Sequence, residues 1–361
     1  YKDEQLSQAA PAPKPSVVPR EVGAGSAIKH VIYIIKENRT YDQVLGDIPG
    51  ANGDPKLCLF GEEITPNQHA LAKQFVLLDN LYCDAEVSAG GHQWSNAAYA
   101  TDAVEKTWPA SYGGKITSDY TNASVPASGY LWDQANRRGL TYRTYGEYAM
   151  RQSDKSSVKP TMEGRGSLVG HTAPNYLGWE ATDPENAKEF IAEFDEYEAH
   201  YDDENAEKRL PNYIVMCLPQ DHTKGTKKGA PTPRAAVANN DYAVGLIVDR
   251  VSHSKYWPET AIFIIEDDAQ DGSDHVDARR TIGQCISPYT RRGLVDSTLY
   301  TTSSMLRTIE LLLGLQPMSQ FDASATPMYN ALGDTADLSA FTCIEPKIDL
   351  EEKNTGGLFG A

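Results

Sequence analysis

Residues 28–38 of the chain, "IKHVIYIIKEN", decide its fold class. The stretch is rich in β-branched residues up to Ile35 and then turns abruptly polar at Lys36, Glu37 and Asn38. A continuous β-branched and aromatic run is typical of a strand whose two faces are both buried in a sheet. These residues therefore predict a central strand that carries polar side chains at its carboxyl end.

Three later apolar runs also end in polar residues, and helical patterns lie between the runs. The apolar runs are "FVLLDNLYC" (75–83), "YIVMCLP" (213–219) and "AIFIIEDD" (261–268). Helices are predicted from Pro66, from about His92, over "AKEFIAEFDEYEAHY" (187–201), and over "STLYTTSSMLRTIELLLGL" (297–315) with its end at Gly314. Strands that alternate with helices predict an α/β fold with a mostly parallel central sheet and helices on both faces.

The chain is expected to form one domain after a short tether. Residues 1–26 are rich in Pro, Ala, Gly and Ser, which is typical of a linker, and residues 27–361 are predicted to be the domain. Residues 103–210 are expected to form an irregular insert. Its aromatic loops, "TWPASYGGK" (107–115) and "GHTAPNYLGWE" (170–180), are expected to wall a substrate pocket.

The composition excludes several classes of protein. The net charge is −17 and no basic stripe is visible, so nucleic acid is not expected as a partner. No run of about 18 apolar residues occurs, so no transmembrane segment is predicted. The five scattered cysteines predict neither a zinc knuckle nor a dense disulfide frame, while one or two bridges stay open. A start at Tyr1, without Met or signal peptide, suggests a piece of a longer protein.

Polar residues follow four of the predicted strands. In an open α/β sheet, ligands bind beyond the carboxyl ends of the strands, so these residues are expected to share one site. They are Glu37 and Asn38, Ser88, Asp221 and His222, and Asp267 and Asp268.

Asp267 and Asp268 indicate a metal site. Two adjacent carboxylates at a strand end would raise each other's pKa unless a cation intervened. Glu37 and Asn38 would add oxygen ligands, and such a set suits Ca²⁺, Mg²⁺ or Mn²⁺. The alternative is that one Asp caps the following helix while the other faces water.

The segment "VSAGGHQWSNAAYA" (87–100) offers a nucleophile. Its small residues allow a sharp turn into a helix, and a helix N-terminus favours an anion. Ser88 lies where its hydroxyl could attack a bound phosphate, and a nearby metal would lower the pKa of that hydroxyl. The alternative is that Ser88 is a loop serine that only caps the helix.

Three motifs in order carry a resemblance to a known family. They are "IKHVIYIIKENRTYDQVLGD" (28–47), "LPQDHTKGT" (218–226) and "IIEDDAQDGSDHVDARRT" (264–281). They resemble the phosphoesterase family that includes bacterial phospholipase C and related acid phosphatases, within the alkaline phosphatase superfamily. The resemblance implies a phosphoserine intermediate and a divalent metal (Zn, Mn or Ca). The implied ligands match Glu37, Asn38, Ser88, Asp267 and Asp268.

The resemblance also assigns roles to cationic side chains. The substrate phosphate is expected to meet His92 and His222 as catalytic groups, with Lys36, Arg39, Lys224 and His275 as further contacts. The segment "YTTSS" has Thr302 where related phospholipases carry a His, which leaves a second metal site open. Asp221, His222 and His275 could hold that second ion, or they could hydrogen-bond the phosphate and the leaving group.

The expected function is a periplasmic or extracellular metal-dependent hydrolase of a small phosphorylated substrate. In bacterial relatives such a domain often follows a β-propeller, and the Pro-rich start suits a linker from one. Two alternatives stay open, a phospholipase C-like phosphodiesterase and a non-catalytic surface binding module that keeps the fold. A sulfatase is disfavoured, because the Cys or Ser followed by Pro and Arg that the resemblance would require is missing from "SAGGH".

Overall fold

The computed structural model describes residues 14–116, 122–152, 157–161, 164, 166–270 and 272–355. Its core is a five-stranded sheet with the strand order β4-β7-β1-β8-β9. The strands are β1 (His30–Lys36), β4 (Tyr142–Tyr145), β7 (Tyr213–Leu218), β8 (Thr260–Glu266) and β9 (Gly283–Ile286). Only β9 among them pairs antiparallel, so the predicted mostly parallel sheet with a central β1 is confirmed.

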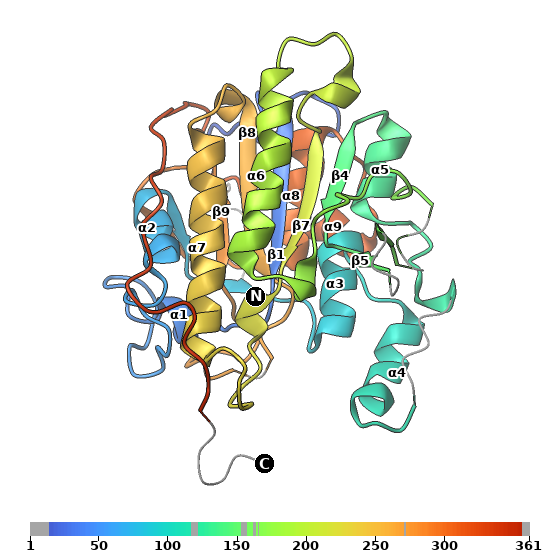
Figure 1. The fold of residues 1–361 in the computed structure, drawn as a ribbon. Helices are drawn as coiled ribbons and strands as arrows, with labels where there is room; N and C mark the ends of the chain where they lie inside the picture. The colour runs from blue at the N-terminus through green and yellow to red at the C-terminus, as the bar shows by residue number, and fades with distance from the viewer. Residues whose placement is uncertain are drawn as a thin grey trace, which may run out of the picture.

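Helices cover both faces of the sheet, as predicted. One face carries α2 (Pro66–Gln74), α6 (Asp183–Ala199) and α7 (Pro233–Ser252), and the other carries α3 (Ser88–Ala97), α5 (Leu131–Arg138) and α8 (Thr302–Leu313). Figure 1 shows α6 and α7 in front of the strands and α8 behind them. The short helix α1 (Tyr41–Leu45) and α4 (Asp102–Tyr112) lie outside these layers, whereas the short helix α9 (Gln320–Ser324) packs against α3 and α8.

The alternation of side chains along β1 explains why it must be central. Ile32 and Ile34 pack into the cluster beneath α2, α6 and α7, whereas Tyr33 and Ile35 pack with α8 on the other side. Successive side chains of a strand point to opposite faces, so a strand that is apolar at every position is stable only between two helical layers.

The helix boundaries agree with the sequence except at two points: α3 begins earlier than predicted, and the helix predicted over 297–315 begins only at Thr302, after β11 (Tyr300–Thr301). α2 starts at Pro66, and α8 ends at Gly314, whose φ of 71° closes the helix in the left-handed conformation. α3 begins at Ser88 and not at about His92. The nucleophile candidate therefore lies in the first turn of the helix and not in a loop before it.

The run 75–83 does not join the central sheet. It forms β2 (Val76–Leu78) and β3 (Leu81–Tyr82), which pair with β10 (Leu294–Asp296) and β11 (Tyr300–Thr301). Asp79 interrupts the run, because its carboxylate accepts a hydrogen bond from the Asn52 N–H at 3.0 Å. The remaining elements are β5 (Ala149–Arg151), β6 (Val158–Pro160) and the 3-10 turns η2 (Asn122–Ser124), η3 (Gly178–Glu180), η4 (Ala206–Lys208), η5 (Gln220–His222) and η6 (Trp257–Glu259).

Two expectations about the domain differ from the structure. Val18 is 2% exposed in the main core and the Val17 N–H donates to the Gly333 carbonyl at 2.7 Å, so residues 14–26 pack on the body and are no free tether. Residues 1–13 lie outside the described residues. The segment 103–210 contributes β4 to the sheet and α6 to its cover, so it is part of the main architecture and not an irregular insert.

The structure also bears on the cysteines and on the expected absence of a transmembrane segment. All five cysteines are free thiols. Among the described residues, every helix is too short or too polar to span a bilayer.

Candidate active site

The carboxyl ends of β1 and β8 meet the first turn of α3. The Asn38 Nδ2 donates to the Ser88 Oγ and to the Asp267 Oδ1, both at 3.1 Å. The Ser88 hydroxyl donates to the Asp268 Oδ2 at 2.8 Å. Three of the strand-end segments that the sequence predicts to share one site are therefore linked by direct hydrogen bonds.

The backbone around this cluster is specialised. Asn38 has a φ of 87°, a strained conformation for a residue other than Gly, and such strain is typical of functional sites. A Cβ at Gly91 would lie 2.7 Å from the Asp267 carbonyl oxygen, so only glycine lets α3 approach the end of β8 this closely. Gly91 of "SAGGH" therefore lets α3 bring Ser88 to the carboxylates.

His92 joins the cluster from the second turn of α3. Its Nε2 lies 3.2 Å from the Glu37 Oε1 and 3.7 Å from the Asp267 Oδ2, and its Nδ1 lies 3.0 Å from the Glu147 Oε1. Glu147 is buried in the turn after β4 and also accepts from the Asn96 amide at 2.7 Å. Glu147 was not predicted, since its only sequence signal is a position just beyond a strand end.

Burial and like charge raise the pKa values of the carboxylates. Burial, followed by the charges of Glu37 and Asp268, raises the pKa of Asp267 well above its ordinary range. Burial also raises the pKa of Asp268, against the hydrogen bond from Ser88. Although burial opposes a charged imidazole, Glu147 and the other carboxylates raise the pKa of His92 well above its ordinary value.

The donor set fits a divalent cation. Oxygen and nitrogen atoms of Glu37, His92 and Asp267 lie within 4.8 Å of one another. The Asn38 Oδ1 and the Asp267 Oδ2 are buried without a hydrogen-bond partner, which is costly unless another group fills their coordination. Carboxylate, amide and imidazole ligands together suit Mn²⁺ or Zn²⁺ as well as the harder cations.

Lys36 and Asp221 lie beneath this cluster and not in it. The Lys36 Nζ, only 1% exposed, pairs with the Glu266 Oε1 at 2.6 Å and the Asp221 Oδ2 at 2.9 Å. Burial and the charge of Asp221 raise the pKa of Glu266 to about 8, while Asp221 also accepts from the Glu37 N–H at 3.0 Å. This placement argues against the expected contact of Lys36 with substrate. Asp221 instead supports the end of β1 through its contacts with Lys36 and the Glu37 N–H.

The other predicted cationic contacts are only partly at the site. Arg39 donates to the carbonyls of Asp221 and His222, the shortest bond being 2.7 Å, so its guanidinium holds the η5 turn. His222 lines the cavity above Ser88. Lys224 lines a neighbouring cavity of about 270 Å³ instead.

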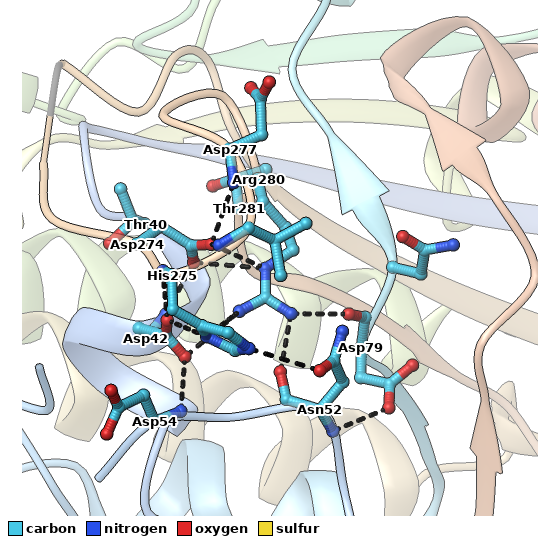
Figure 2. Close-up of polar contacts among 12 residues, drawn as sticks. Thr40, Asp42, Asn52, Asp54, Asp79, Asp274, His275, Asp277, Arg280 and Thr281 are labelled. Atoms are coloured by element: carbon cyan, nitrogen blue, oxygen red, sulfur yellow. Dashed lines mark hydrogen bonds and ion pairs between the residues drawn. The ribbon is translucent and has the colours of Figure 1, made fainter. Parts of the chain in front are cut away.

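His275 belongs to a separate polar cluster (Figure 2). Its Nδ1 lies 2.6 Å from the Asp42 Oδ2, and the fully buried Arg280 joins Asp42 at 3.0 Å to Asp274 at 2.9 Å. Arg280 also donates to the carbonyls of Asn52 and Asp79. The oxygens of Asp42 and Asp274 already accept hydrogen bonds from these groups and from backbone N–H groups, so His275 is engaged away from the Ser88 cluster.

A cavity of about 410 Å³ opens above Ser88, and several of its walls come from the segment 103–210, as expected. Gly146 has a φ of 83° and Tyr148 a φ of 49°, so the turn that carries Glu147 is a tight, strained wall. The lining residues are Glu37, Ser88, Ala89, His92, Tyr112, Gly146, Glu147, Tyr148, Ala149, Met150, Thr161, Trp179, Cys217 and His222.

Comparison with solved structures supports the fold. A protein in the alkaline phosphatase superfamily from Vibrio parahaemolyticus superposes with a TM-score of 0.53 at 15% identity over 86% of this chain and 72% of that one. The lipoteichoic acid synthase LtaP from Listeria monocytogenes gives 0.52 at 11% identity over 88% and 78%. These similarities confirm an alkaline phosphatase-like fold. A search of curated proteins gives no significant match.

Comparison with protein families identifies the chain more directly. Residues 55–316 match the Phosphoesterase family, and this segment includes Ser88, His92, Asp267 and Asp268. Glu37 and Asn38 precede the segment and are tied to it by the hydrogen bonds described above. Because the match spans well over half of its length, the chain belongs to the phosphoesterase family.

Proposed function

We propose that the protein is a metal-dependent hydrolase of phosphate esters that uses Ser88 as its nucleophile. The observation that carries the proposal is the placement of Ser88. Its hydroxyl lies at the N-terminus of α3, bonded to Asn38 and Asp268, on the floor of a cavity that also exposes Glu37 and His92. The partial positive charge of a helix N-terminus favours a bound phosphate.

We propose that Glu37, Asn38, His92, Asp267 and Asp268 hold the metal. A divalent cation bound there would neutralise the carboxylates and stabilise negative charge on the phosphoryl oxygens. His92 was expected to act in catalysis, but its position between Glu37 and Asp267 favours the role of a ligand. Glu147 would fix the orientation of its ring from behind, as carboxylates do for many metal-binding histidines.

The reaction is proposed to proceed in two displacements. The Ser88 Oγ forms a bond to phosphorus as its proton passes to Asp268, 2.8 Å away, and the bond from phosphorus to the alcohol oxygen breaks. The His222 Nδ1 donates to the Thr223 carbonyl at 3.0 Å, which leaves Nε2 to protonate the departing alcohol. Water then attacks phosphorus and gives its proton to His222, while the bond from phosphorus to the Ser88 Oγ breaks and that oxygen takes back the proton held by Asp268.

The first test is hydrolysis of p-nitrophenyl phosphate by metal-loaded protein, compared between the wild type and Ser88→Ala across Zn²⁺, Mn²⁺ and Ca²⁺. The proposal predicts turnover in the wild type and its loss in Ser88→Ala with metal still bound. Equal turnover in both would exclude Ser88 as the nucleophile. Absence of turnover in both, also with bis(p-nitrophenyl) phosphate, would favour a binding module.

Bis(p-nitrophenyl) phosphate also separates the two enzyme classes. Preference for the diester would favour the phospholipase C type, and preference for the monoester the acid phosphatase type. The proposed location is periplasmic or extracellular, and a preceding β-propeller remains a proposal from the sequence.

A further inference from the structure

We infer that the substrate is a phosphate ester of an uncharged, apolar alcohol, and that Tyr112, Met150 and Trp179 select it. This inference rests on the proposed function, because it concerns the leaving-group side of the same cavity. The three residues, named the apolar collar here, all line the cavity above Ser88. They come from the end of α4, from β5 and from η3.

The collar is apolar surface that folding leaves in water. Tyr112 is 59% exposed, Met150 60% and Trp179 56%. Single exposed apolar side chains are common on any protein surface, but a group of them around one cavity is typical of a binding site. An apolar substrate group that covers them would gain free energy in proportion to the area removed from water.

The collar is also held close to the reacting centre. The Ala89 N–H donates to the Tyr112 hydroxyl at 3.2 Å, which fixes that ring beside the residue after Ser88. Trp179 meets His222 edge to face with ring centroids 5.5 Å apart. The collar therefore lies next to both the proposed nucleophile and the proposed proton donor for the leaving alcohol.

Charge in the cavity disfavours a leaving group with a second anionic group. Among the described residues that line it, none is Lys or Arg, while Glu37 and Glu147 are carboxylates. The nearby cations are engaged elsewhere, Lys36 in buried ion pairs and Arg39 at backbone carbonyls. A second phosphate or a carboxylate on the alcohol would be desolvated in a cavity whose described lining offers it no Lys or Arg.

The test compares three phosphate monoesters whose alcohols have similar intrinsic reactivity: benzyl phosphate, ethyl phosphate and 4-carboxybenzyl phosphate. For the metal-loaded wild type we expect kcat/KM for benzyl phosphate to exceed each of the other two by about tenfold or more. Trp179→Ala and Met150→Ala are expected to lower the benzyl-to-ethyl ratio severalfold.

Leu299→Ala is the matched control, because Leu299 is 61% exposed and does not line the cavity. This variant is expected to keep the wild-type ratio. A wild-type benzyl-to-ethyl ratio of kcat/KM near one would overturn the inference while the proposed function stands. A ratio that is unchanged in both Trp179→Ala and Met150→Ala would do the same. Binding of benzylphosphonate, measured by calorimetry, gives a second readout that should weaken in Trp179→Ala and persist in Leu299→Ala. Failure of all three esters and of p-nitrophenyl phosphate would overturn the proposed function itself.

Discussion

The Ser88 hydroxyl donates to the Asp268 Oδ2 at 2.8 Å, across 180 residues of sequence. This bond joins the first turn of α3 to the second residue after the central strand β8. It orients the oxygen that would attack phosphorus and places an acceptor where the hydroxyl proton must go. The two residues together make the site more than a cluster of acidic side chains.

The two glycines of α3 give a matched test of how closely that helix must approach β8. A Cβ at Gly91 would meet the Asp267 carbonyl at 2.7 Å, whereas a Cβ at Gly90 meets nothing closer than 3.5 Å. Gly91→Ala is expected to displace the metal ligands and reduce kcat at least about tenfold. Gly90→Ala should keep activity and gain up to about 1 kcal/mol in helix stability. Activity assays with thermal denaturation of both variants decide this, and equal behaviour would contradict it.

Glu147 is expected to matter for metal affinity although it lies behind His92. Glu147→Gln should weaken Mn²⁺ binding by about 10- to 100-fold, because the His92 ring loses its charged partner at 3.0 Å. Titration calorimetry of the metal-free protein measures the change. Glu196→Gln, on the exposed side of α6, is the control and should bind as the wild type does. Unchanged affinity in Glu147→Gln would remove Glu147 from the site.

Arg280 is predicted to anchor α1, which follows β1, to the loop that follows β8 (Figure 2). It is fully buried and bridges Asp42 of α1 and Asp274 of that loop. Arg280→Met would leave two buried carboxylates without their cation, so we expect it to lower the free energy of unfolding by about 3 to 5 kcal/mol.

The neighbouring Arg279 provides the control for that substitution. Its side chain is 53% exposed and its closest ion-pair contact is 3.5 Å to Asp277. Arg279→Met should change the free energy of unfolding by no more than about 0.5 kcal/mol. Urea denaturation compares the two, and similar losses in both would contradict the anchoring role of Arg280.

Asp183 is expected to make stability depend on pH. Burial is the largest influence and raises the pKa of Asp183. The charge of Asp221 raises it further, and a hydrogen bond from Asn240 lowers it. Together they bring the pKa to about 7. The folded protein therefore keeps a proton on Asp183 that the unfolded chain releases near the ordinary value of 3.8. Its contribution to stability is complete below about pH 4 and is lost as the pH rises through about 7.

Asp183→Asn removes this titration. Calorimetric melting temperatures should fall more steeply in the wild type than in the variant as the pH rises from about 5 to about 8, by a few degrees in total. Parallel curves would show that Asp183 is already ionised in the folded protein at the lower pH.

Much of the fold followed from patterns of hydrophobicity. The runs around Ile32, Ile214 and Ile264 are apolar at nearly every position, and such runs can only be central strands covered on both faces. The run 75–83 was placed less well, because pairing partners such as β10 and β11 lie more than 200 residues away and leave no local signal. The role of residues 14–26 was missed because Val18 is a single apolar anchor in a Pro-rich segment.

The sequence predicted which residues lie at the strand ends of the site. It did not predict the positions that depend on the direction of a side chain or on the path of a distant turn. Glu37, Asn38, Asp267 and Asp268 meet because the carboxyl ends of the parallel strands β1 and β8 share one edge, and the first turn of α3 brings Ser88 to them. Lys36 follows the alternation of β1 and points to the α2 face with Ile34, away from the cavity. That alternation could be read from the sequence. The position of Glu147 could not be predicted, because nothing in the local sequence shows that its turn folds back over α3.

The most direct test of the account is to look for phosphate on Ser88. Metal-loaded protein is mixed with p-nitrophenyl phosphate, quenched in acid within the first turnovers, digested and examined by mass spectrometry. Attack by Ser88 predicts one phosphoryl group on the peptide that contains Ser88, and none in Ser88→Ala. Turnover without any phosphorylated peptide, or with the phosphoryl group on another residue, would contradict it.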